Sequence, residues 1–247
     1  MVFAALWRRT RESGETPPPA FSLLIRGGTV YDGSGGLPRV ADIGIVRDRI
    51  AAIGDLGWMN GRVEIDARGL AVAPCFINSL SWATESIIED ATAESDMRQG
   101  VTLEVFGEGL SMGPLNASMR GDLRLRRLGS RYPLDWNTLG EYLEFLEKRG
   151  VGVNVASLVG ATTVRIHELG HADRSPNARE LTRMQGLVRQ AMLEGALGVG
   201  SSLIYAPAAF AAPAELQALA LAAAGYGGGS FWPVRCESTR LLTAFGV

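Results

Sequence analysis

The stretch 73–83, with the sequence APCFINSLSWA, changes character within a few residues. Its first part is short and apolar, as in a buried strand, and its second part carries Asn78, Ser79 and Ser81. The segment that follows, 83–99, spaces its apolar residues as a helix does. The stretch therefore predicts a strand that ends in a polar loop and leads into a helix.

The same order recurs four more times along the chain. Strand-like segments occur at 101–107, 151–160, 196–204 and 229–234, and helix-like segments follow at 138–150, 177–195, 213–227 and 237–245. Thr138 and Glu141 have the spacing of a capping box, which supports the first of these helices. Five successive strand–helix units predict an α/β fold with a parallel sheet, either doubly wound or a barrel. In both cases we expect the chemistry beyond the carboxyl ends of the strands.

Residues 21–70 have a different pattern, in which short apolar runs alternate with turn residues. The segment 42–55, DIGIVRDRIAAIGD, predicts a hairpin with its tip at Arg47–Arg49. We therefore expect three parts: a flexible extension over 1–20, a small all-β domain over 21–70, and the strand–helix series over 71–247.

Composition restricts the class of protein. Hydrophobic residues make up 47% of the chain and charged residues 20%, which is typical of a globular protein. The formal net charge is −2, and no basic stripe is interleaved with aromatic residues, so we expect no nucleic-acid partner. No apolar window is long enough to predict a membrane span. Cys75 and Cys236 lie far apart, which favours a reducing, cytoplasmic location, and Cys75 is expected to be a buried thiol.

Several segments resemble the amidohydrolase superfamily, and more narrowly its D-aminoacylase or N-acyl-D-amino-acid deacylase group. The resemblance rests on IRGGTVYDGSG, VAPCFIN, QGVTLEVFGEGLSMGPL and MQGLVRQAMLEGALGVGSSLIYAP, which occur in the family's order. It implies a small β-sandwich-like domain and a TIM-type (β/α) barrel, a divalent metal such as zinc, and a small-molecule N-acyl amino acid as substrate. The metal would polarise the amide carbonyl and activate a water molecule, and an aspartate would act as general base.

The family's functional residues are poorly matched. Members end their first barrel strand with His-x-His, and the matching positions here are Leu80 and Trp82. A metal-binding cysteine of the group is matched by Glu108, which is our candidate metal ligand because a carboxylate can bind zinc or manganese. Pro233 stands at a ligand histidine's position, while Arg235 and Glu237 keep their places. The catalytic residues are unknown, because the general-base aspartate would lie beyond Val247.

Other groups offer weaker alternatives. His167 and His171 are four residues apart, as in a zinc motif, but Gly170 and Pro176 argue against a helix there, and surface histidines are the simpler interpretation. Ser201 and Ser202 lack a serine hydrolase's GxSxG motif. The acid at Glu108 could also merely cap a turn.

The chain is also short for the family. A complete barrel takes about 250 residues, so residues 71–247 accommodate an incomplete barrel of about five units. We therefore expect a truncated hydrolase of non-peptide C–N bonds that is inactive alone. The alternatives are a metal-free binding or scaffolding protein on the same fold, and a decayed fragment.

Overall fold

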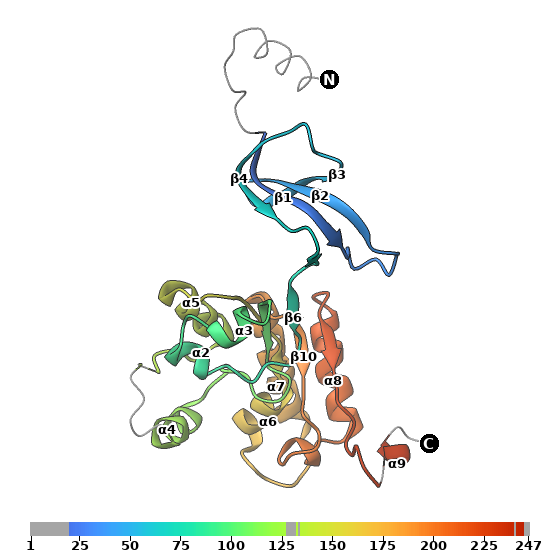
Figure 1. Ribbon diagram of the computed structural model, residues 1–247. Helices are drawn as coiled ribbons and strands as arrows, with labels where there is room; N and C mark the ends of the chain where they lie inside the picture. The colour runs from blue at the N-terminus through green and yellow to red at the C-terminus, as the bar shows by residue number, and fades with distance from the viewer. Residues whose placement is uncertain (1–19, 127–131, 133, 240, 245–247) are drawn as a thin grey trace. The chain divides into compact units, whose positions relative to one another are not determined.

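The computed structural model of the protein describes residues 20–126, 132, 134–239 and 241–244. The chain divides into two compact units, the first ending at Cys75 and the second beginning at Phe76 (Figure 1). The predicted extension over 1–20 lies almost entirely outside the described residues.

The first unit is a twisted sheet with the strand order β3-β2-β1-β4, in which β5 also pairs with β1 (Figure 1). The pairs β1–β2 and β2–β3 are antiparallel, whereas β4 and β5 run parallel to β1. Its strands are β1 (Phe21–Val30), β2 (Arg39–Val46), β3 (Arg49–Gly54), β4 (Gly61–Asp66) and β5 (Ala71–Val72).

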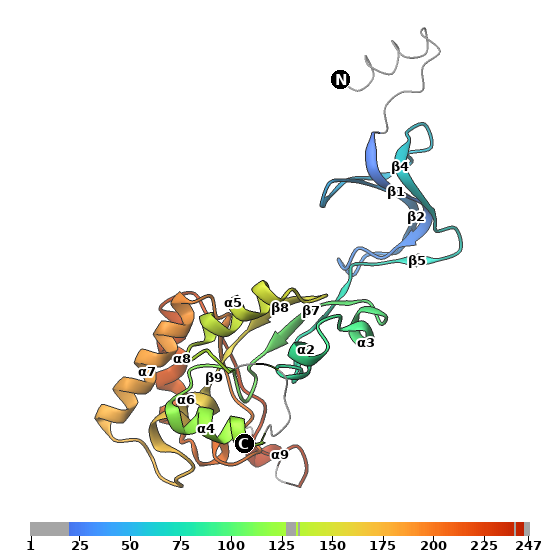
Figure 2. The same cartoon turned by 90° about the vertical axis from the view of Figure 1, so that its left-hand side faces the viewer.

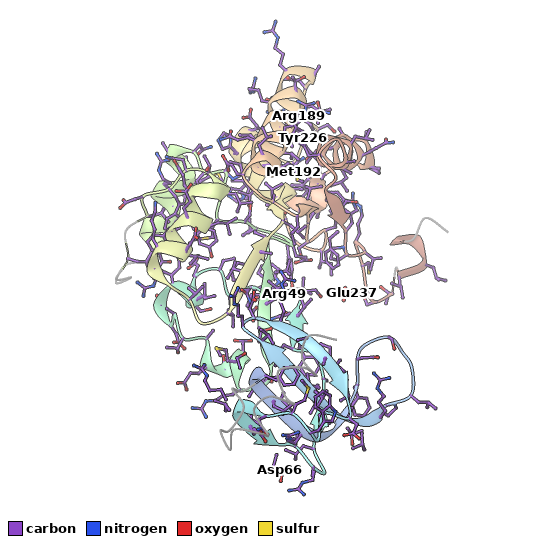
Figure 3. The ribbon with its side chains drawn as sticks, turned by 90° about the horizontal axis from the view of Figure 1, so that it is seen from above. Arg49, Asp66, Arg189, Met192, Tyr226 and Glu237 are labelled. Carbon is purple, nitrogen blue, oxygen red and sulfur yellow. The ribbon has the colours of Figure 1, made fainter. Side chains whose placement is uncertain are left out.

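The predicted hairpin is present between β2 and β3. Val46 faces Arg49 across the turn, and Arg47 adopts a positive φ of 57°. At the far end of β4, Asp66 forms a surface ion pair with Arg68 at 2.6 Å (Figure 3). Between residues 21 and 70, all the regular elements are strands.

The second unit contains two three-stranded parallel sheets, β6-β7-β8 and β9-β10-β11. The chain passes from one sheet to the other at a single residue, Leu158. The Leu158 N–H donates to the Phe106 carbonyl at 2.8 Å, and the neighbouring Ser157 carbonyl accepts from the Leu197 N–H at 2.9 Å. The strands are β6 (Phe76–Asn78), β7 (Val101–Phe106), β8 (Asn154–Ser157), β9 (Val159–Gly160), β10 (Gly198–Gly200) and β11 (Gly229–Phe231).

Helices connect these strands, and α7 and α8 run alongside each other in both views (Figures 1 and 2). The predicted capping box of α5 forms, since Thr138 Oγ1 accepts from the Glu141 N–H at 3.2 Å. The helical segments are α2 (Ser86–Glu89), α3 (Glu94–Met97), α4 (Ala117–Arg126), α5 (Leu139–Arg149), α6 (Ala161–Leu169), α7 (Ala178–Leu193), the 3₁₀ turn η1 (Ala208–Phe210), α8 (Pro213–Ala224) and α9 (Leu241–Ala244).

The core of the second unit lies between its strands and helices. Trp136 packs against Tyr142 and Phe145, and its indole N–H donates to the Met112 carbonyl at 2.8 Å. Phe106 of β7 and Met184 of α7 belong to the same buried cluster. These contacts attach the loop after β7 to the helical layer.

Two predictions about helices were wrong. The segment 83–99 forms two short helices instead of one, because Ala93 takes a left-handed conformation and Asp90 accepts hydrogen bonds from the Thr92 backbone and hydroxyl. A further helix, α4, forms between β7 and α5, where the sequence pattern predicted no helix.

The surface also departs from expectation in two places. Phe76 and Ile77 of β6 are more than 60% exposed. Adjacent residues of a strand point to opposite faces, so β6 has accessible side chains on both faces. Cys75 is exposed, because it lies in the link between β5 and β6 and not inside a strand. Among the described residues, no helix has the length and apolar character required to cross a membrane.

Candidate functional site

The loops at the carboxyl ends of the strands meet in the second unit, as the parallel arrangement predicts. Gly109, in the loop after β7, lies against Trp82 from the loop after β6 and against Ser202 from the loop after β10. Glu237, labelled in Figure 3, lies in the chain that follows β11 and is close enough to Glu108 to affect the ionisation of the Glu108 carboxyl. We call Trp82, Glu108, Ser202, Tyr205 and Glu237 the mouth.

Glu108 reaches this position through an unusual backbone at Gly107. Gly107 has a φ of 88°, and a Cβ atom there would lie 2.0 Å from the Leu158 carbonyl oxygen. Only glycine tolerates both the positive φ and this close approach. The conformation turns the chain at the end of β7, so that Glu108 is directed into the protein and is 5% exposed.

Burial raises the pKa of the Glu108 carboxyl. A smaller contribution comes from Glu237, since a nearby like charge disfavours ionisation, while a hydrogen bond with the Ser202 hydroxyl opposes the shift. The uncharged form of Glu108 is therefore favoured more strongly than in water. Such a carboxyl can donate or accept hydrogen bonds, or bind a cation after losing its proton.

A buried serine fixes the rest of the β7 loop. The Ser111 N–H donates to Thr163 Oγ1 at 2.8 Å, and Ser111 Oγ accepts from the Gly160 N–H at 2.9 Å. Both partners lie at the junction between β9 and α6. Buried hydrogen bonds thus hold the loop that carries Glu108 to the neighbouring strand and helix.

Two exposed aromatic residues stand at the edge of the mouth. Trp82 and Tyr205 make an edge-to-face contact with 6.5 Å between ring centroids, and they are 57% and 61% exposed. Trp82 also packs on Gly109, next to Glu108. The Trp82 ring therefore packs against its neighbours, although it lies at the surface.

The chain after β11 is held by Arg235. Its guanidinium donates to the carbonyls of Ala209 and Ala211, next to η1 and α8. This attachment holds the segment between Pro233 and Glu237 near the loop after β10, where Glu237 itself is exposed.

The donors expected for zinc are not assembled at the mouth. Leu80, Trp82 and Pro233 offer no side-chain lone pair suited to the metal. Throughout the part of the chain that the structure describes, no three His, Cys, Asp or Glu side chains are grouped as a metal site requires. Glu108 and Glu237 are two carboxylates where structural and catalytic zinc sites use at least three protein ligands, so the described residues do not fit zinc.

His167 and His171 do not supply the missing zinc ligands. His167 lies in α6, contrary to our prediction that Gly170 prevents a helix there, because Gly170 ends the helix with a φ of 61° instead of interrupting it. His171 comes after the helix end and is exposed. The imidazole of His167 faces Glu168 at 3.2 Å.

Sequence reasoning missed a second buried acid, Glu104. It lies inside β7, is 1% exposed, and accepts a hydrogen bond from the Asn78 side chain at 3.1 Å. Its other oxygen, Oε1, has no hydrogen-bond partner among the described residues. The signal was present as a glutamate within the apolar strand sequence VTLEVF, which charge alone would have marked as unusual.

No family model matches the chain. The chain is 34% identical over 226 residues to a D-aminoacylase and 36% identical over 206 residues to an N-acyl-D-glutamate deacylase, both from Alcaligenes xylosoxydans xylosoxydans. These matches cover 91% and 83% of this chain, but 46% and 42% of the relatives. The chain therefore spans about half the length of these curated relatives.

Solved structures give the same result. The crystal structure of a D-aminoacylase, described as defining a novel subset of amidohydrolases, matches with a TM-score of 0.80 and 30% identity. The N-acyl-D-glutamate deacylase of Bordetella bronchiseptica, complexed with zinc and a phosphonate that mimics the tetrahedral intermediate, matches with a TM-score of 0.80 and 31% identity. Each match covers 92% of this chain and 48% of the solved one. The α/β fold class is confirmed, and the chain is similar in sequence and structure to the N-terminal part of D-aminoacylases and N-acyl-D-amino-acid deacylases.

Proposed function

We propose that the protein is a hydrolase of non-peptide C–N bonds whose substrates are N-acyl-D-amino acids. Cleavage of the amide would add water across the C–N bond and give a carboxylic acid and a free D-amino acid. The observation that carries this proposal is the match over 92% of the chain to an N-acyl-D-glutamate deacylase that binds a mimic of the tetrahedral intermediate.

The described residues of this chain would supply only part of the proposed active site. Glu108 is the proposed metal residue, because it is held at the carboxyl end of β7 and aimed into the mouth. Since the described residues do not fit zinc by themselves, any further donors and the general-base aspartate would have to come from outside them. We therefore expect the chain to be inactive alone.

We also propose the domain limits 1–20, 21–70 and 71–247, with the last forming an incomplete TIM-type barrel of about five units. The row of strands from β6 to β11, interrupted only at Leu158, supports the barrel. We propose a cytoplasmic location, which the two free cysteines favour.

A β-sandwich-like arrangement of the first unit is supported by one face of its sheet. Strand register places eight aliphatic side chains in two rows across β3, β2, β1 and β4, and the outer members Ile50 and Val63 are 63% and 52% exposed. A second sheet packed on this face would bury them. The rows are Ile53, Ile43, Ile25 and Ile65, and Ile50, Ile45, Leu23 and Val63.

A metal-free binding or scaffolding protein is the second candidate. It is favoured by Leu80, Trp82 and Pro233, which replace metal-binding side chains by apolar ones at or beside the mouth. The third interpretation, a decayed fragment, would be supported by failure of the chain to fold.

A chimera tests the hydrolase. Residues 20–247 would be fused to the C-terminal half of the Alcaligenes D-aminoacylase, and release of free amino acid from N-acetyl-D- and N-acetyl-L-amino acids would be measured with and without zinc. We expect hydrolysis of the D-substrate only, lost in the Glu108→Gln chimera, and no hydrolysis by the chain alone. A folded chimera that binds an N-acyl-D-amino acid without cleaving it would instead support the binding protein.

A further inference from the structure

We propose that Glu104 keeps a proton on Oε1 and donates it to the Asp96 carboxylate, and that this shared proton holds the segment 92–99 against β7. Loss of the proton at alkaline pH would open the segment while the rest of the second unit stays folded. The inference goes beyond the proposed hydrolase activity, because it requires neither a bound metal nor a substrate.

The two oxygens of the Glu104 carboxyl have different surroundings. Oε2 accepts a hydrogen bond from the Asn78 side chain at 3.1 Å, and the Ser81 hydroxyl interacts with the same carboxyl. Oε1 is buried and has no hydrogen-bond partner among the described residues. A buried ionised oxygen without a donor is costly, whereas a protonated oxygen becomes a donor itself. A proton on Oε1 therefore requires an acceptor opposite it.

Asp96 of α3 provides that acceptor. Helix α3 packs beside β7 (Figure 2), and the Asp96 carboxyl lies within hydrogen-bonding reach of the Glu104 carboxyl. Two carboxylates this close repel each other when both are ionised, but one shared proton replaces the repulsion by a charge-assisted hydrogen bond. Glu104 is the more buried of the two, since it is 1% exposed, so the neutral form is assigned to Glu104.

The charged groups around Glu104 reduce to this pair. Its partners on β6 and in the following loop are uncharged, and so is Val155, its neighbour on β8. On α3 the other charged residues, Glu94 and Arg98, pair with each other at 3.0 Å on the exposed surface. Burial and, to a smaller extent, Asp96 raise the pKa of the Glu104 carboxyl. The pH dependence of the contact is therefore assigned to Glu104 and Asp96.

The segment 92–99 has few other attachments. None of the four described residues of α3 is buried. Ala93, which precedes α3, has a φ of 47°, a left-handed conformation that is unfavourable for alanine. Backbone hydrogen bonds fix the chain on either side, where the Ala91 carbonyl accepts at 2.7 Å and the Gly100 carbonyl at 2.8 Å. The contact with Glu104 therefore decides whether the chain between these two points stays closed.

Loss of the proton affects the two sides of Glu104 differently. On the side of α3 it leaves two like charges that repel each other. On the side of β6 the Asn78 amide and the Ser81 hydroxyl donate to the carboxyl, and such bonds favour its ionised form. We therefore expect the loop after β6 to keep its place while α3 moves away from β7.

Hydrogen exchange of the full chain, followed by mass spectrometry and corrected for the intrinsic pH dependence of exchange, measures this opening. The backbone N–H groups of Met97, Arg98 and Gln99 donate within the turn of α3 and report on it. We expect their protection to fall about tenfold or more between about pH 6 and pH 9, since a difference of one pKa unit changes the equilibrium tenfold. The amides of α5 should keep their protection over the same range.

Two variants separate the charges from the fold. Glu104→Gln and Asp96→Asn each remove one carboxylate, and the new amide can donate the hydrogen bond in place of the shared proton. We expect both variants to stay protected at alkaline pH. The matched control is Glu94→Gln on the exposed side of α3, which should lose protection as the parent chain does. Circular dichroism establishes that each variant is folded.

Infrared spectroscopy tests the position of the proton. Near pH 6 exposed carboxyl groups are ionised, so the carbonyl stretch of a protonated acid reports on buried groups. Burial favours the neutral form of Glu108 as well, so the bands are assigned by substitution. We expect Glu104→Gln to remove a band that Glu108→Gln leaves in place.

Three results would overturn the proposal. Constant protection of α3 in the parent chain across this pH range would mean that no proton holds the segment. A pH-dependent loss that persists in Glu104→Gln would place the titrating group elsewhere. Loss of protection on addition of EDTA near pH 6 would mean that a metal ion, and not a proton, joins the two carboxyl groups. None of these results depends on the hydrolase assay of the chimera, so the two proposals fail independently.

Discussion

Arg165 Nη1 and Glu215 Oε2 lie 2.6 Å apart, and both side chains are at most 2% exposed. The pair joins α6 to α8, and Arg165 Nη2 also donates to the carbonyls of Ala172 and Arg174. Removal of the carboxylate leaves a buried guanidinium without its counter-charge. We predict that Glu215→Gln lowers the free energy of unfolding by about 3–5 kcal/mol, measured by urea titration.

Glu144 provides the control for this pair. It forms an exposed ion pair with Lys148 at 3.4 Å, so Glu144→Gln should cost at most about 1 kcal/mol. Equal losses of unfolding free energy in the two variants would show that burial does not determine how much the Arg165–Glu215 pair stabilises the protein.

Glu104 should make the protein less stable at high pH. Burial raises the pKa of its carboxyl, and the nearby Asp96 carboxyl adds to this effect, so ionisation is more costly in the folded state than in the unfolded state. Stability is then greatest below the unfolded pKa of about 4.5 and is lost as pH rises toward the folded pKa. We predict that Glu104→Gln flattens the decline of melting temperature between pH 4.5 and 8.5.

The exposed Glu94 on α3 is the control for Glu104, and Glu94→Gln should leave that decline intact. A Glu104→Gln variant with the parent's pH profile would contradict the prediction, because it would place the titrating group elsewhere.

Glu180 should have the opposite effect to Glu104, because its titration makes the protein less stable at acid pH. Two hydrogen bonds from the Arg174 guanidinium at 2.8 Å, and one from the Asn177 N–H at 2.8 Å, lower the pKa of its carboxyl to about 2. The stability that it contributes is present above the unfolded pKa of about 4.5 and is lost as pH falls toward about 2. We predict that Glu180→Gln reduces stability at pH 7 and shows a shallower further loss on acidification, followed by circular dichroism.

The exposed Glu147 on α5 serves for comparison, since Glu147→Gln should keep the acid-dependent loss of the parent chain. If the Glu180→Gln variant were as stable as the parent at pH 7, the Arg174–Glu180 interaction and the capping of α7 would make no net contribution to stability.

Alanine substitutions at Gly107 and Gly150 distinguish the cost of a positive φ from the cost of a steric clash. Both have positive φ values, 88° and 74°, but only a Cβ at Gly107 would collide with backbone, at Leu158. We predict that Gly150→Ala costs about 1 kcal/mol of unfolding free energy and that Gly107→Ala costs at least about 3 kcal/mol. Similar losses in chemical denaturation would mean that the β7 loop can move away from Leu158.

The sequence predicted the features that depend on local patterns. The hairpin at Arg47 and the capping box at Thr138 follow from turn residues and caps, and both are present. The order of strands and helices follows from apolar spacing, apart from the break at Ala93 and the additional helix α4. The break at Ala93 depends on a left-handed conformation that alanine rarely adopts, so composition did not reveal it. The exposure of Cys75 depends on where β5 ends, and strand boundaries are weakly encoded by local sequence.

The candidate site was predictable in part. The strand–helix order identified the loops that meet at the mouth, including those of Trp82, Glu108 and Ser202. The pairing of Trp82 with Tyr205 and the approach of Glu237 to Glu108 arise from side chains far apart in sequence, whose distances local patterns do not define. The role of Glu108 as a metal ligand stays a prediction.

The passage of the chain through Leu158 has a consequence for how the second unit tolerates sequence change. One residue separates β8, which is registered against β7, from β9, which is registered against β10. An insertion or deletion at this point would slide one sheet past the other by a residue and invert which side chains face the helices. The length of the segment 154–160 is therefore constrained by two strand registers at once.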